Sequence, residues 1–390
     1  MNPPGALAIA GVEAAAVHAP RDAIELGETL ARAAREQRCV ALVGGGTKLA
    51  LGRAPERLDA VIRTRQMNRI LEYAPADLVL IAEAGATLAE LRAVTREHRQ
   101  QLALDPPFAG QATVGGIIAT NDSGPGRARY GAVKDLIIGA TLVRADGVLA
   151  RSGGKVVKNV AGFDLPKLVC GSLGTLAAIA TASFRLHPLP ESEATVLVAP
   201  LEASSLHPLL QQVREAQLEP VRAVAFRSGA AWELALSFEG FEAGVREQCT
   251  RLSQLAAAQR LGDESTAQLW SRHARVREQG VYRLKLTLPP SRFAALEPRL
   301  APLGGEWVYY ATLGLAHLSC ASIEPGAIDE ARAALSSCGG SLVVQAMPDS
   351  ARARIDPWGP LPAAFTVMQQ LKQSFDPERR LNRGRFVGGL

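Results

Sequence analysis

The chain has 390 residues, of which 47% are hydrophobic and 21% are charged, so it can build a sizeable core and is not disordered throughout. At about 150 residues per domain, this length predicts two or three folded units. Aromatic residues make up 5% of the chain and the formal net charge is +5. Nucleic-acid binding is therefore not expected, because it needs stacking aromatic side chains or a strongly basic surface.

The positions of the cysteines and the lengths of the apolar runs indicate the cellular compartment of the protein. Five cysteines lie at positions 39, 170, 249, 320 and 338, without a Cys-x-x-Cys pair. This spacing predicts a reducing compartment and gives no basis for a disulfide framework, a zinc site or an iron–sulfur cluster. Residues 1–20 lack the basic head and compact apolar run of a signal peptide, and no stretch approaches the roughly 18 apolar residues of a spanning helix. We expect a cytoplasmic location, or docking at the inner face of the membrane through partner proteins.

The first 105 residues alternate strand-like and helix-like patterns, which is typical of an α/β arrangement. Residues 21–38 carry apolar and alanine positions at helical spacing, and Thr87 is the expected N-cap of a second helix that reaches about residue 99. The expected strands are 39–43, 59–63, 78–84 and a short strand at 102–107 that two prolines end.

Residues 113–193 are rich in glycine and small polar residues and lead to a domain boundary. The expected elements are a strand at 136–143, an Asp-Gly turn at 146–147, a strand at 148–151 and a strand that ends near Pro188. A cluster of proline and glutamate at 188–193 is the best candidate for the boundary between domains.

After residue 193 the glycine-rich motifs stop and a second pattern begins. The expected strands are 194–200, 221–227, 232–238, 281–288, 306–320 and 341–346. The expected helices lie near 204–216, 242–260, 327–337 and 362–373. This pattern predicts a second α+β domain on an antiparallel sheet.

The segment GGGTK, residues 44–48, directly follows an expected strand. Consecutive glycines leave main-chain N–H groups uncovered, Thr47 adds a hydroxyl and Lys48 adds a positive charge, so the segment is a candidate anion-binding loop. It is not a Walker loop, because Leu49 follows Lys48 where that motif needs Ser or Thr. Leu49 also occupies the sixth position from Gly44, where the Gly-x-Gly-x-x-Gly dinucleotide motif needs glycine. A tight turn without a ligand is the alternative interpretation.

Three further small-residue elements lie within residues 113–176. They are Thr113-Val114-Gly115-Gly116 together with 119–124, then Arg129-Tyr130-Gly131, and then 171–176. One such element predicts only a turn. Four of them in one region, three after a strand or strand-like run, predict a single extended polyphosphate ligand.

In chain order, the segments GGGTK, PFAGQATVGGIIATNDSG, RYGAVKDLIIGATLVRADGVLARSGGKVVKN and GSLGTLAAI resemble the FAD-binding domain of the vanillyl-alcohol-oxidase, or PCMH-type, flavoproteins. Within that family, the chain is most similar to the FAD-binding E subunits of bacterial glycolate oxidases. The resemblance covers about residues 40–190, and FDPERRLNRGRF is a fainter match to the family's C-terminal segment. It implies an α+β fold: a two-subdomain PCMH-type FAD-binding domain (1–190), a second α+β cap domain on an antiparallel sheet (191–350), and a C-terminal segment (351–390) that returns to the flavin domain.

The resemblance also implies which residues bind FAD. The first pyrophosphate loop would be Gly44, Gly45, Gly46, Thr47 and Lys48. The second loop, which passes the pyrophosphate and the isoalloxazine, would be Thr113, Gly115, Gly116, Thr120, Asn121, Ser123 and Gly124, followed by the turn at Tyr130 and Gly131. The segment beside the adenosine would be Gly171, Ser172, Gly174, Thr175 and Ile179, and Asn382 would lie near the flavin ring. Arg383 stands where the family usually has Pro, and Arg385 where Lys is common. Non-covalent binding is expected, because the first loop has neither histidine nor cysteine.

The chain lacks a recognisable acid–base set. Oxidation of a 2-hydroxy acid needs a base, a cation for the carboxylate and often a metal ion. The larger dehydrogenases of the family carry a His-x-Gly-Asp-Gly-Asn-x-His motif, whereas the nearest two of the six histidines here are 20 residues apart. His317 in TLGLAH is interpreted as a strand histidine without catalytic duty, and Cys170 as a small buried residue and not a reactive thiol. No catalytic residue and no metal site is predicted.

The resemblance therefore implies an FAD-binding subunit of a glycolate, or 2-hydroxy-acid, oxidase complex that is not active alone. A sister FAD-containing subunit would oxidise the substrate, and an iron–sulfur subunit would pass electrons toward the membrane quinone pool. Two alternatives remain open at this point. In the first alternative, the chain is an autonomous FAD-linked 2-hydroxy-acid dehydrogenase. In the second, it is a structural subunit whose flavin site is vestigial.

Overall fold

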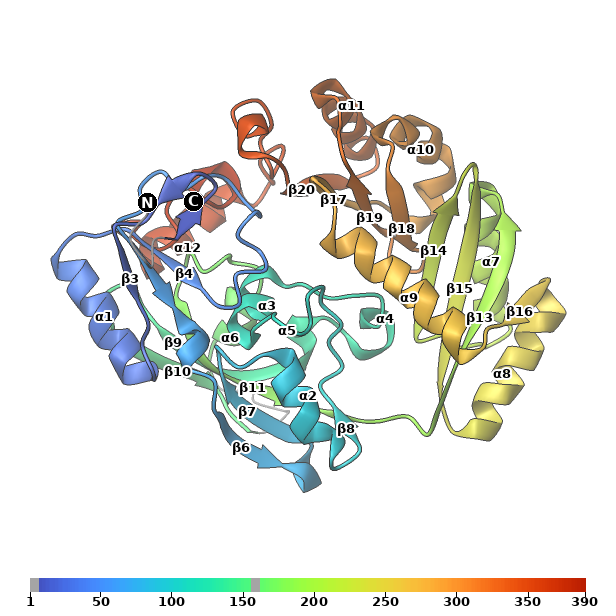
Figure 1. Ribbon diagram of the computed structural model, residues 1–390, viewed down its shortest axis with the longest axis horizontal. Helices are drawn as coiled ribbons and strands as arrows, with labels where there is room; N and C mark the ends of the chain where they lie inside the picture. Colours follow the sequence, from blue (N-terminus) through green and yellow to red (C-terminus); the bar gives the residue numbers. More distant parts are fainter. Residues whose placement is uncertain (1–6, 156–161) are drawn as a thin grey trace. The chain divides into compact units, whose positions relative to one another are not determined.

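The computed structural model describes residues 7–155 and 162–390, and in it the chain folds into two units (Figure 1). The first unit contains residues 7–124, 131–189 and 360–390, and the second contains 125–130 and 190–359. The chain therefore enters the second unit twice and ends in the first. The last four residues of the expected RYG…KN segment, 156–159, lie outside the described residues. The assignment of 1–190, 191–350 and 351–390 to a flavin domain, a cap and a returning segment stays a prediction.

The first unit begins with a small parallel sheet in the order β3-β5-β4. Its strands are β3 (Ala16–His18), β5 (Ala60–Arg63) and β4 (Val40–Val43). Helix α1 (Ala23–Arg35) starts after Asp22, whose side chain accepts hydrogen bonds from two first-turn N–H groups. The helix buries Leu26 and Leu30 in a core that it shares with β4 and β5. The helix at 21–38 and the strands at 39–43 and 59–63 are thus confirmed.

A five-stranded antiparallel sheet, in the order β10-β9-β11-β7-β6, forms the rest of this unit. Its strands are β10 (Leu149–Gly153), β9 (Ile137–Val143), β11 (Ala178–Arg185), β7 (Val79–Glu83) and β6 (Ile70–Ala74). The helices that share its core are α2 (Leu88–Arg96), α3 (Val114–Thr120), α5 (Val133–Leu136) and α6 (Leu165–Val169). Thr87 caps α2 as predicted, with Glu90 completing a capping box.

The C-terminal segment adds an edge to the parallel sheet. After α12 (Phe365–Phe375), Leu381 pairs in parallel with Val40. The Val40 N–H donates to the Arg380 carbonyl at 2.9 Å, and the Asn382 N–H donates to the Val40 carbonyl at 2.9 Å. Leu381 is fully buried in the core under α1. The last residues of the chain therefore lie beside the strand that leads into GGGTK.

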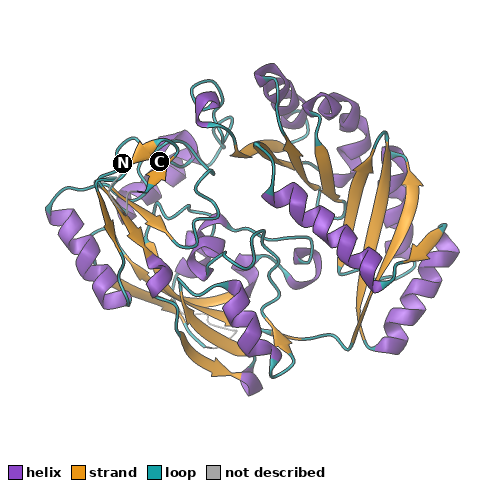
Figure 2. Cartoon of the chain, viewed as in Figure 1, coloured by secondary structure: helices purple, strands orange, loops and turns teal. Residues whose placement is uncertain are grey.

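The second unit is built on an eight-stranded antiparallel sheet in the order β16-β13-β15-β14-β18-β19-β17-β20 (Figure 2). Its strands are β13 (Ser192–Leu201), β14 (Arg222–Ser228), β15 (Ala231–Gly240), β16 (Ala258–Arg260), β17 (Tyr282–Thr287), β18 (Glu306–Tyr310), β19 (Leu315–Cys320) and β20 (Ser341–Ala346). The helices that cover the larger core are α7 (Ala203–Glu215), α8 (Glu242–Leu255), α10 (Phe293–Leu300) and α11 (Pro325–Ser336). Helix α9 (Asp263–Glu278) covers a smaller, separate core on this sheet.

Several predicted elements of the chain are wrong in detail. Residues 102–107 form no strand, because Leu102 and Leu104 are buried in the apolar core of the first unit without pairing in a ladder. The single strand expected at 306–320 is a hairpin, since Gly314 turns the chain between β18 and β19 at a φ of +63°. The helix expected at 242–260 ends at Leu255, and α9 was not predicted.

The remaining elements are short. They are β1 (Ala8–Ile9), β2 (Val12–Glu13), β8 (Gln100–Gln101), β12 (His187–Pro188), α4 (Arg127–Tyr130), and the 3₁₀ turns Thr64–Gln66, Pro75–Asp77, Pro290–Arg292, Ala301–Leu303, Asp349–Ala351 and Val387–Gly389. Among the described residues, no helix combines the length and the apolar character that crossing a membrane requires.

Candidate functional site

An open cleft lies in the first unit, where the loop after β4, the start of α3 and the turn before β11 meet. The residues that line it come from three segments, 42–49, 113–120 and 173–179, together with Thr64, Asn382 and Arg385. Segments that are distant in the sequence, including GGGTK and GSLGTLAAI, thus contribute to one site. The C-terminal segment completes it.

The three positions of the first loop require glycine for different physical reasons. A Cβ on Gly44 would lie 2.0 Å from the Thr113 hydroxyl oxygen, and a Cβ on Gly45 would lie 1.9 Å from the Gln111 carbonyl oxygen. Both glycines are therefore required because the loop packs against residues 111–113. Gly46 has a φ of +74°, and a Cβ there would meet only Leu49, at 3.8 Å. Only this third glycine leaves its main chain open toward the cleft.

Thr113 joins the two predicted loops. It is the N-cap of α3, and its hydroxyl oxygen accepts hydrogen bonds from the N–H groups of Gly45 and Gly116, each at 3.4 Å. At the other end of α3, the Thr120 hydroxyl donates to the Gly116 carbonyl at 2.8 Å. Thr113 thus holds the GGGTK loop against the start of α3, which gives the cleft a continuous wall of main chain and small side chains.

Two cationic side chains line the cleft. Lys48 forms an ion pair with Asp122, and 16% and 7% of the two side chains are exposed. Arg385 is buried, and its guanidinium donates to the carbonyl oxygens of Leu49 at 2.8 Å and Leu51 at 2.7 Å. The carboxylate of Asp122 balances the charge of Lys48. Arg385 is a second cation in this partly enclosed site, where charges are screened less than in water.

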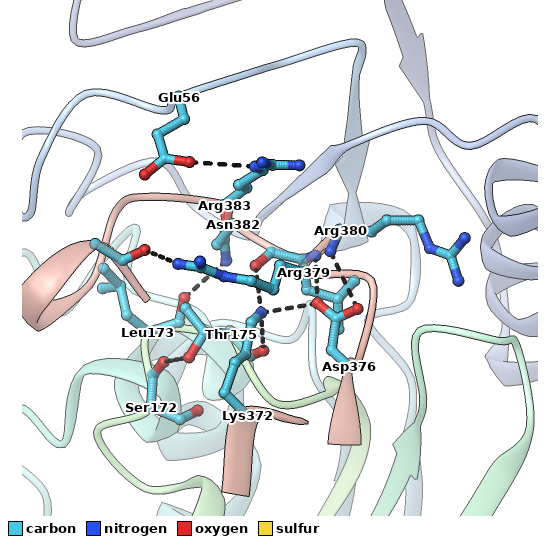
Figure 3. A network of polar contacts seen from close by, with 12 residues as sticks. Glu56, Ser172, Leu173, Thr175, Lys372, Asp376, Arg379, Arg380, Asn382 and Arg383 are labelled. Carbon is cyan, nitrogen blue, oxygen red and sulfur yellow. Dashed lines mark hydrogen bonds and ion pairs between the residues drawn. The ribbon is translucent and has the colours of Figure 1, made fainter. Parts of the chain in front are cut away.

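The third wall is a turn whose shape depends on Asn382. Gly171 and Gly174 have φ values of +79° and +67°. Asn382 itself lies in the left-handed region, with a φ of 45°, and its side-chain amide donates to the Leu173 carbonyl at 2.7 Å. Its Oδ1 accepts a hydrogen bond from the Leu42 N–H at 3.3 Å. Asn382 thus joins the glycine turn to the end of β4, as Figure 3 shows for Leu173.

Twelve of the twenty predicted cofactor residues line the cleft. They are Gly44, Gly45, Gly46, Thr47, Lys48, Thr113, Gly115, Gly116, Thr120, Gly174, Ile179 and Asn382. The eight that do not line it are Asn121, Ser123, Gly124, Tyr130, Gly131, Gly171, Ser172 and Thr175. Whether any of the twenty contacts the cofactor stays a prediction.

Several of the eight shape the chain next to the cleft. Asn121 ends α3 at a φ of 47°. The Gly124 N–H donates to Asp105 Oδ1 at 2.6 Å. Gly131 turns the chain at a φ of +89°. Gly171, Ser172 and Thr175 line a separate cavity of about 200 Å³.

Tyr130 belongs to the second unit, whereas Gly131, with which the resemblance groups it, belongs to the first. Its hydroxyl donates to Glu239 Oε2 at 2.6 Å. Burial, and then the hydrogen bond and charge of Glu239, raise the pKa of Tyr130. The neutral phenol therefore anchors the 125–130 segment to β15, and the structure gives Tyr130 this structural role.

Nine residues that line the cleft were not predicted. They are Leu42, Val43, Leu49, Thr64, Ala119, Leu173, Ala177, Ala178 and Arg385. Most adjoin a predicted motif and could have been included by extending it by one or two residues. Thr64 and Arg385 could not, because they reach the cleft only through the packing of the sheet and of the C-terminal segment.

The lining fits the chemistry of FAD. A side chain at Gly46 would extend into nearly open space, since the nearest atom to an added Cβ is 3.8 Å away, whereas an added Cβ at Gly116 would lie only 3.3 Å from the Thr113 hydroxyl oxygen. Bare main chain at these positions suits a diphosphate, and Lys48 and Arg385 supply positive charge. Leu173 and Ile179 supply apolar surface for the flat rings. No histidine, cysteine, tyrosine, aspartate or glutamate is among the described residues that line the cleft.

Comparison with known proteins identifies the cofactor. Residues 14–153 match the family described as FAD binding domain. The chain is 29% identical over 370 residues to glycolate oxidase subunit GlcE of Escherichia coli (strain K12), covering 93% of this chain and 97% of that protein. It is 29% identical to D-lactate dehydrogenase of Archaeoglobus fulgidus, with 95% and 91% covered. It is 33% identical to glycolate oxidase subunit GlcD of Bacillus subtilis (strain 168), but over only 47% of this chain and 39% of that protein.

A solved structure of alkyldihydroxyacetonephosphate synthase has the same fold. It superposes with a TM-score of 0.71 at 18% identity, covering 94% of this chain and 75% of that chain. These findings confirm the predicted resemblance, the α+β fold with a PCMH-type FAD-binding domain and an antiparallel second sheet, and FAD as the cofactor.

Proposed function

Since the chain is an FAD-binding oxidoreductase, we propose that it serves as the FAD-binding subunit of a glycolate, or 2-hydroxy-acid, oxidising complex. In this proposal a sister FAD-containing subunit oxidises the substrate, and the chain described here supports electron transfer from it toward an iron–sulfur subunit. The complex docks at the inner face of the membrane through those partners. The near full-length similarity to a protein named as a glycolate oxidase subunit supports this choice of complex.

One observation carries the proposal that the chain is not active alone: the cleft is suited to a dinucleotide but offers no acid–base side chain among its described lining residues. Abstraction of the hydroxyl proton needs a base within hydrogen-bonding reach of the substrate. Among the lining residues that the structure describes, the ionisable groups are two cations, Lys48 and Arg385, and Lys48 is already paired with Asp122. Arg385 cannot act as a base, because guanidinium stays protonated.

Two buried histidines of the second unit support the same conclusion. His317 lies on β19 with 2% of its surface exposed, and His273 lies on α9 with 9% exposed. The His273 Nε2 is 2.7 Å from the Tyr310 hydroxyl, and the Tyr310 and His317 rings lie 5.4 Å apart. These side chains form an internal cluster between the helix and the sheet, which is a structural arrangement.

Bound FAD would supply reversible one- and two-electron transfer. In the proposed site, Gly46, Thr113 and Gly116 leave space for the diphosphate, while Lys48 and Arg385 offset its charge. Leu173 and Ile179 contact the flat parts of the cofactor, and Asn382 fixes the wall between them. The chain thereby binds the cofactor, orients it and shields part of it from water.

An autonomous FAD-linked 2-hydroxy-acid dehydrogenase is the second candidate. The similarity to D-lactate dehydrogenase over 95% of this chain favours it. In that case a base from outside the cleft lining must reach the substrate. Turnover by the isolated chain separates the two proposals.

The decisive experiment compares the isolated chain with the complex. Purified chain, reconstituted with FAD and showing a flavin absorption spectrum, is assayed with glycolate and D-lactate and an artificial acceptor. We expect negligible turnover alone, and turnover when the chain is co-purified from its native cells with a second flavoprotein and an iron-containing subunit. Enzyme-like turnover by the isolated chain would establish the autonomous dehydrogenase. Absence of a flavin spectrum after reconstitution would leave only a structural subunit.

A further inference from the structure

The geometry points to Lys372 and Asp376 as positioning residues for FAD: this buried ion pair fixes the wall of the cleft formed by Asn382 and the glycine turn. Neither side chain lines the cleft. The inference rests on the proposed function, in which the cleft holds the cofactor, and it assigns a role to two residues that were not among the predicted cofactor residues.

Lys372 connects three segments of the first unit (Figure 3). Its Nζ donates to Asp376 Oδ2 at 2.7 Å, to the Thr175 carbonyl at 2.7 Å and to the Leu381 carbonyl at 3.1 Å. The two charged side chains are 3% and 0% exposed. A single ammonium group thus binds α12, the glycine turn and the C-terminal segment together.

Asp376 determines the path of the chain toward Asn382. Its Oδ1 accepts a hydrogen bond from the Arg380 N–H at 3.1 Å, and its Oδ2 accepts one from the Leu381 N–H at 2.7 Å. The carboxylate therefore closes the turn after α12 and sets the main chain of the residue directly before Asn382.

Asn382 transmits this position to the cleft. Its side chain bonds to the main chain of Leu42 and Leu173, both of which line the cleft. The fit is close, since a Cβ on Gly174 would lie 2.7 Å from Asn382 Nδ2. A small displacement of Leu381 and Asn382 must therefore move the glycine turn or the end of β4, and so change the shape of the cleft.

The pair is costly to bury, which favours a positional role. Burial lowers the pKa of Lys372, and the charge and hydrogen bond of Asp376 offset only part of that effect. Replacing a buried ion pair by neutral residues of similar size is often neutral or stabilising, so such pairs are weak contributors to stability. In the double variant, the effect on geometry can therefore be measured separately from the effect on folding, whereas each single variant also leaves a buried polar or charged group without its partner.

The test uses the full-length chain with Lys372→Met, Asp376→Asn and the double variant. The matched control is Arg21→Met, which breaks an exposed pair of the same spacing, Arg21 with Glu25. FAD dissociation constants come from fluorescence titration of the apoprotein, and thermal midpoints are measured without FAD. We expect the three variants to bind FAD about ten- to a hundredfold more weakly, the usual loss when a supporting contact is removed. The control should bind FAD as the wild type does.

A pH profile distinguishes positioning from general destabilisation. The titratable or charged groups that act on Lys372 are Asp376, Arg379 and Cys39. In Asp376→Asn the ammonium loses its carboxylate, which lowers the pKa of Lys372 further, so FAD affinity should recover as the amine becomes neutral at a pH below the usual lysine pKa. The double variant has no group to titrate there and should show no such recovery.

The inference is overturned if the double variant folds and binds FAD within about twofold of the wild type, or if Asp376→Asn shows no pH dependence beyond that of the double variant. Failure of the underlying site is recognised separately with Gly116→Leu, whose side chain would fill the cleft. Wild-type affinity in that variant would show that FAD binds elsewhere, whatever the result at Lys372. The double variant also covers the case in which a single variant does not fold.

Discussion

Replacing Gly45 by alanine tests how the cleft is built. The added Cβ would lie 1.9 Å from the Gln111 carbonyl oxygen, whereas ordinary contact begins at 3.4 Å. The difference, 3.4 − 1.9 = 1.5 Å, is the separation that the loop after β4 and the segment before α3 must gain. Main-chain atoms lie on both sides of this contact, so no flexible side chain can absorb the shift.

The magnitude follows from the cost of overpacking. Inserting a methyl group into a packed region typically costs about 1–3 kcal/mol. For a unit of this size, each kcal/mol lowers the melting temperature by about 2–4 °C. Separation of the two segments also lengthens the bond between the Gly45 N–H and the Thr113 hydroxyl, which is already 3.4 Å. We therefore expect FAD affinity to fall by about tenfold or more, which corresponds to about 1.4 kcal/mol.

The assay is FAD titration with thermal unfolding, and the chain supplies its own controls. Gly110 lies in the same facing segment and has no atom within 4 Å of an added Cβ, so Gly110→Ala should leave both measurements unchanged. Gly46→Ala has space but a φ of +74°, so it should cost about 1 kcal/mol of folding stability through backbone strain; because Gly46 lines the cleft, it is a control for the melting temperature and not for FAD affinity. A Gly45→Ala variant with the melting temperature and FAD affinity of Gly110→Ala would refute the proposed packing of the two loops.

Three further predictions concern other parts of the chain. Burial, and then the charges of Arg277 and Arg222, lower the pKa of His273 well below 6.5. As pH falls below about 6.5, the unfolded chain therefore gains a proton before the folded chain does, and the free energy of unfolding drops by at most about 1.4 kcal/mol per pH unit. Chemical denaturation of His273→Gln at several pH values should show that this share of the pH dependence is lost. Burial raises the pKa of Cys170 to about 12, so iodoacetamide at pH 8 should modify it far more slowly than a free thiol, as peptide mass spectrometry would show. Thr87→Ala removes the cap of α2 and should cost about 1 kcal/mol of unfolding free energy, whereas no loss would contradict the capping box.

The fold of the first unit was predictable where local sequence determines local structure. Buried apolar runs give β4 and β5, and Thr87 gives the start of α2. The segment 102–107 shows the limit of this reasoning. Leu102 and Leu104 alternate with smaller or polar residues as in a strand, but the Leu104 N–H bonds to the Leu102 carbonyl at 2.7 Å, within the segment. A segment that buries alternate side chains without pairing with another strand shows the same alternation of residue types.

Helix α9 was not predicted, because its sequence shows no clear pattern of apolar residues. Its sixteen residues are mostly charged or polar, and its buried residues are His273, Val276 and Arg277. Two of these three are polar types that a sequence pattern places on the surface. They are buried because the helix lies on the sheet over the small core that includes Tyr310. Such a helix can be recognised only when the sheet beneath it is known.

The candidate site also has parts that local sequence predicts and parts that it does not. Motifs such as GGGTK were found because glycine and small polar residues mark them locally, and their lining of one cleft could be anticipated from the family resemblance. The contacts of Arg385 and of the Lys372–Asp376 pair could not be predicted, although the C-terminal match includes Arg385 and Asp376, because these contacts join residues that are distant in the sequence, such as Lys372 Nζ and the Thr175 carbonyl. A basic tail in the sequence gave no indication that Arg385 is buried beside Leu49 and Leu51.

The glycines of GGGTK also show why the motif is informative only together with its partner segment. Bare amides for a phosphate are one reason for glycine, but Gly44 and Gly45 are needed because Thr113 and Gln111 lie against them. The first loop therefore requires the second loop to be present in the same fold, and each restricts the residues of the other. A triple glycine alone predicts only a turn, whereas a triple glycine with a matching Gln-Ala-Thr-Val-Gly-Gly segment predicts two surfaces that fit. Substitutions at Gly45 and Thr113 should consequently be non-additive, because either one already separates the loops.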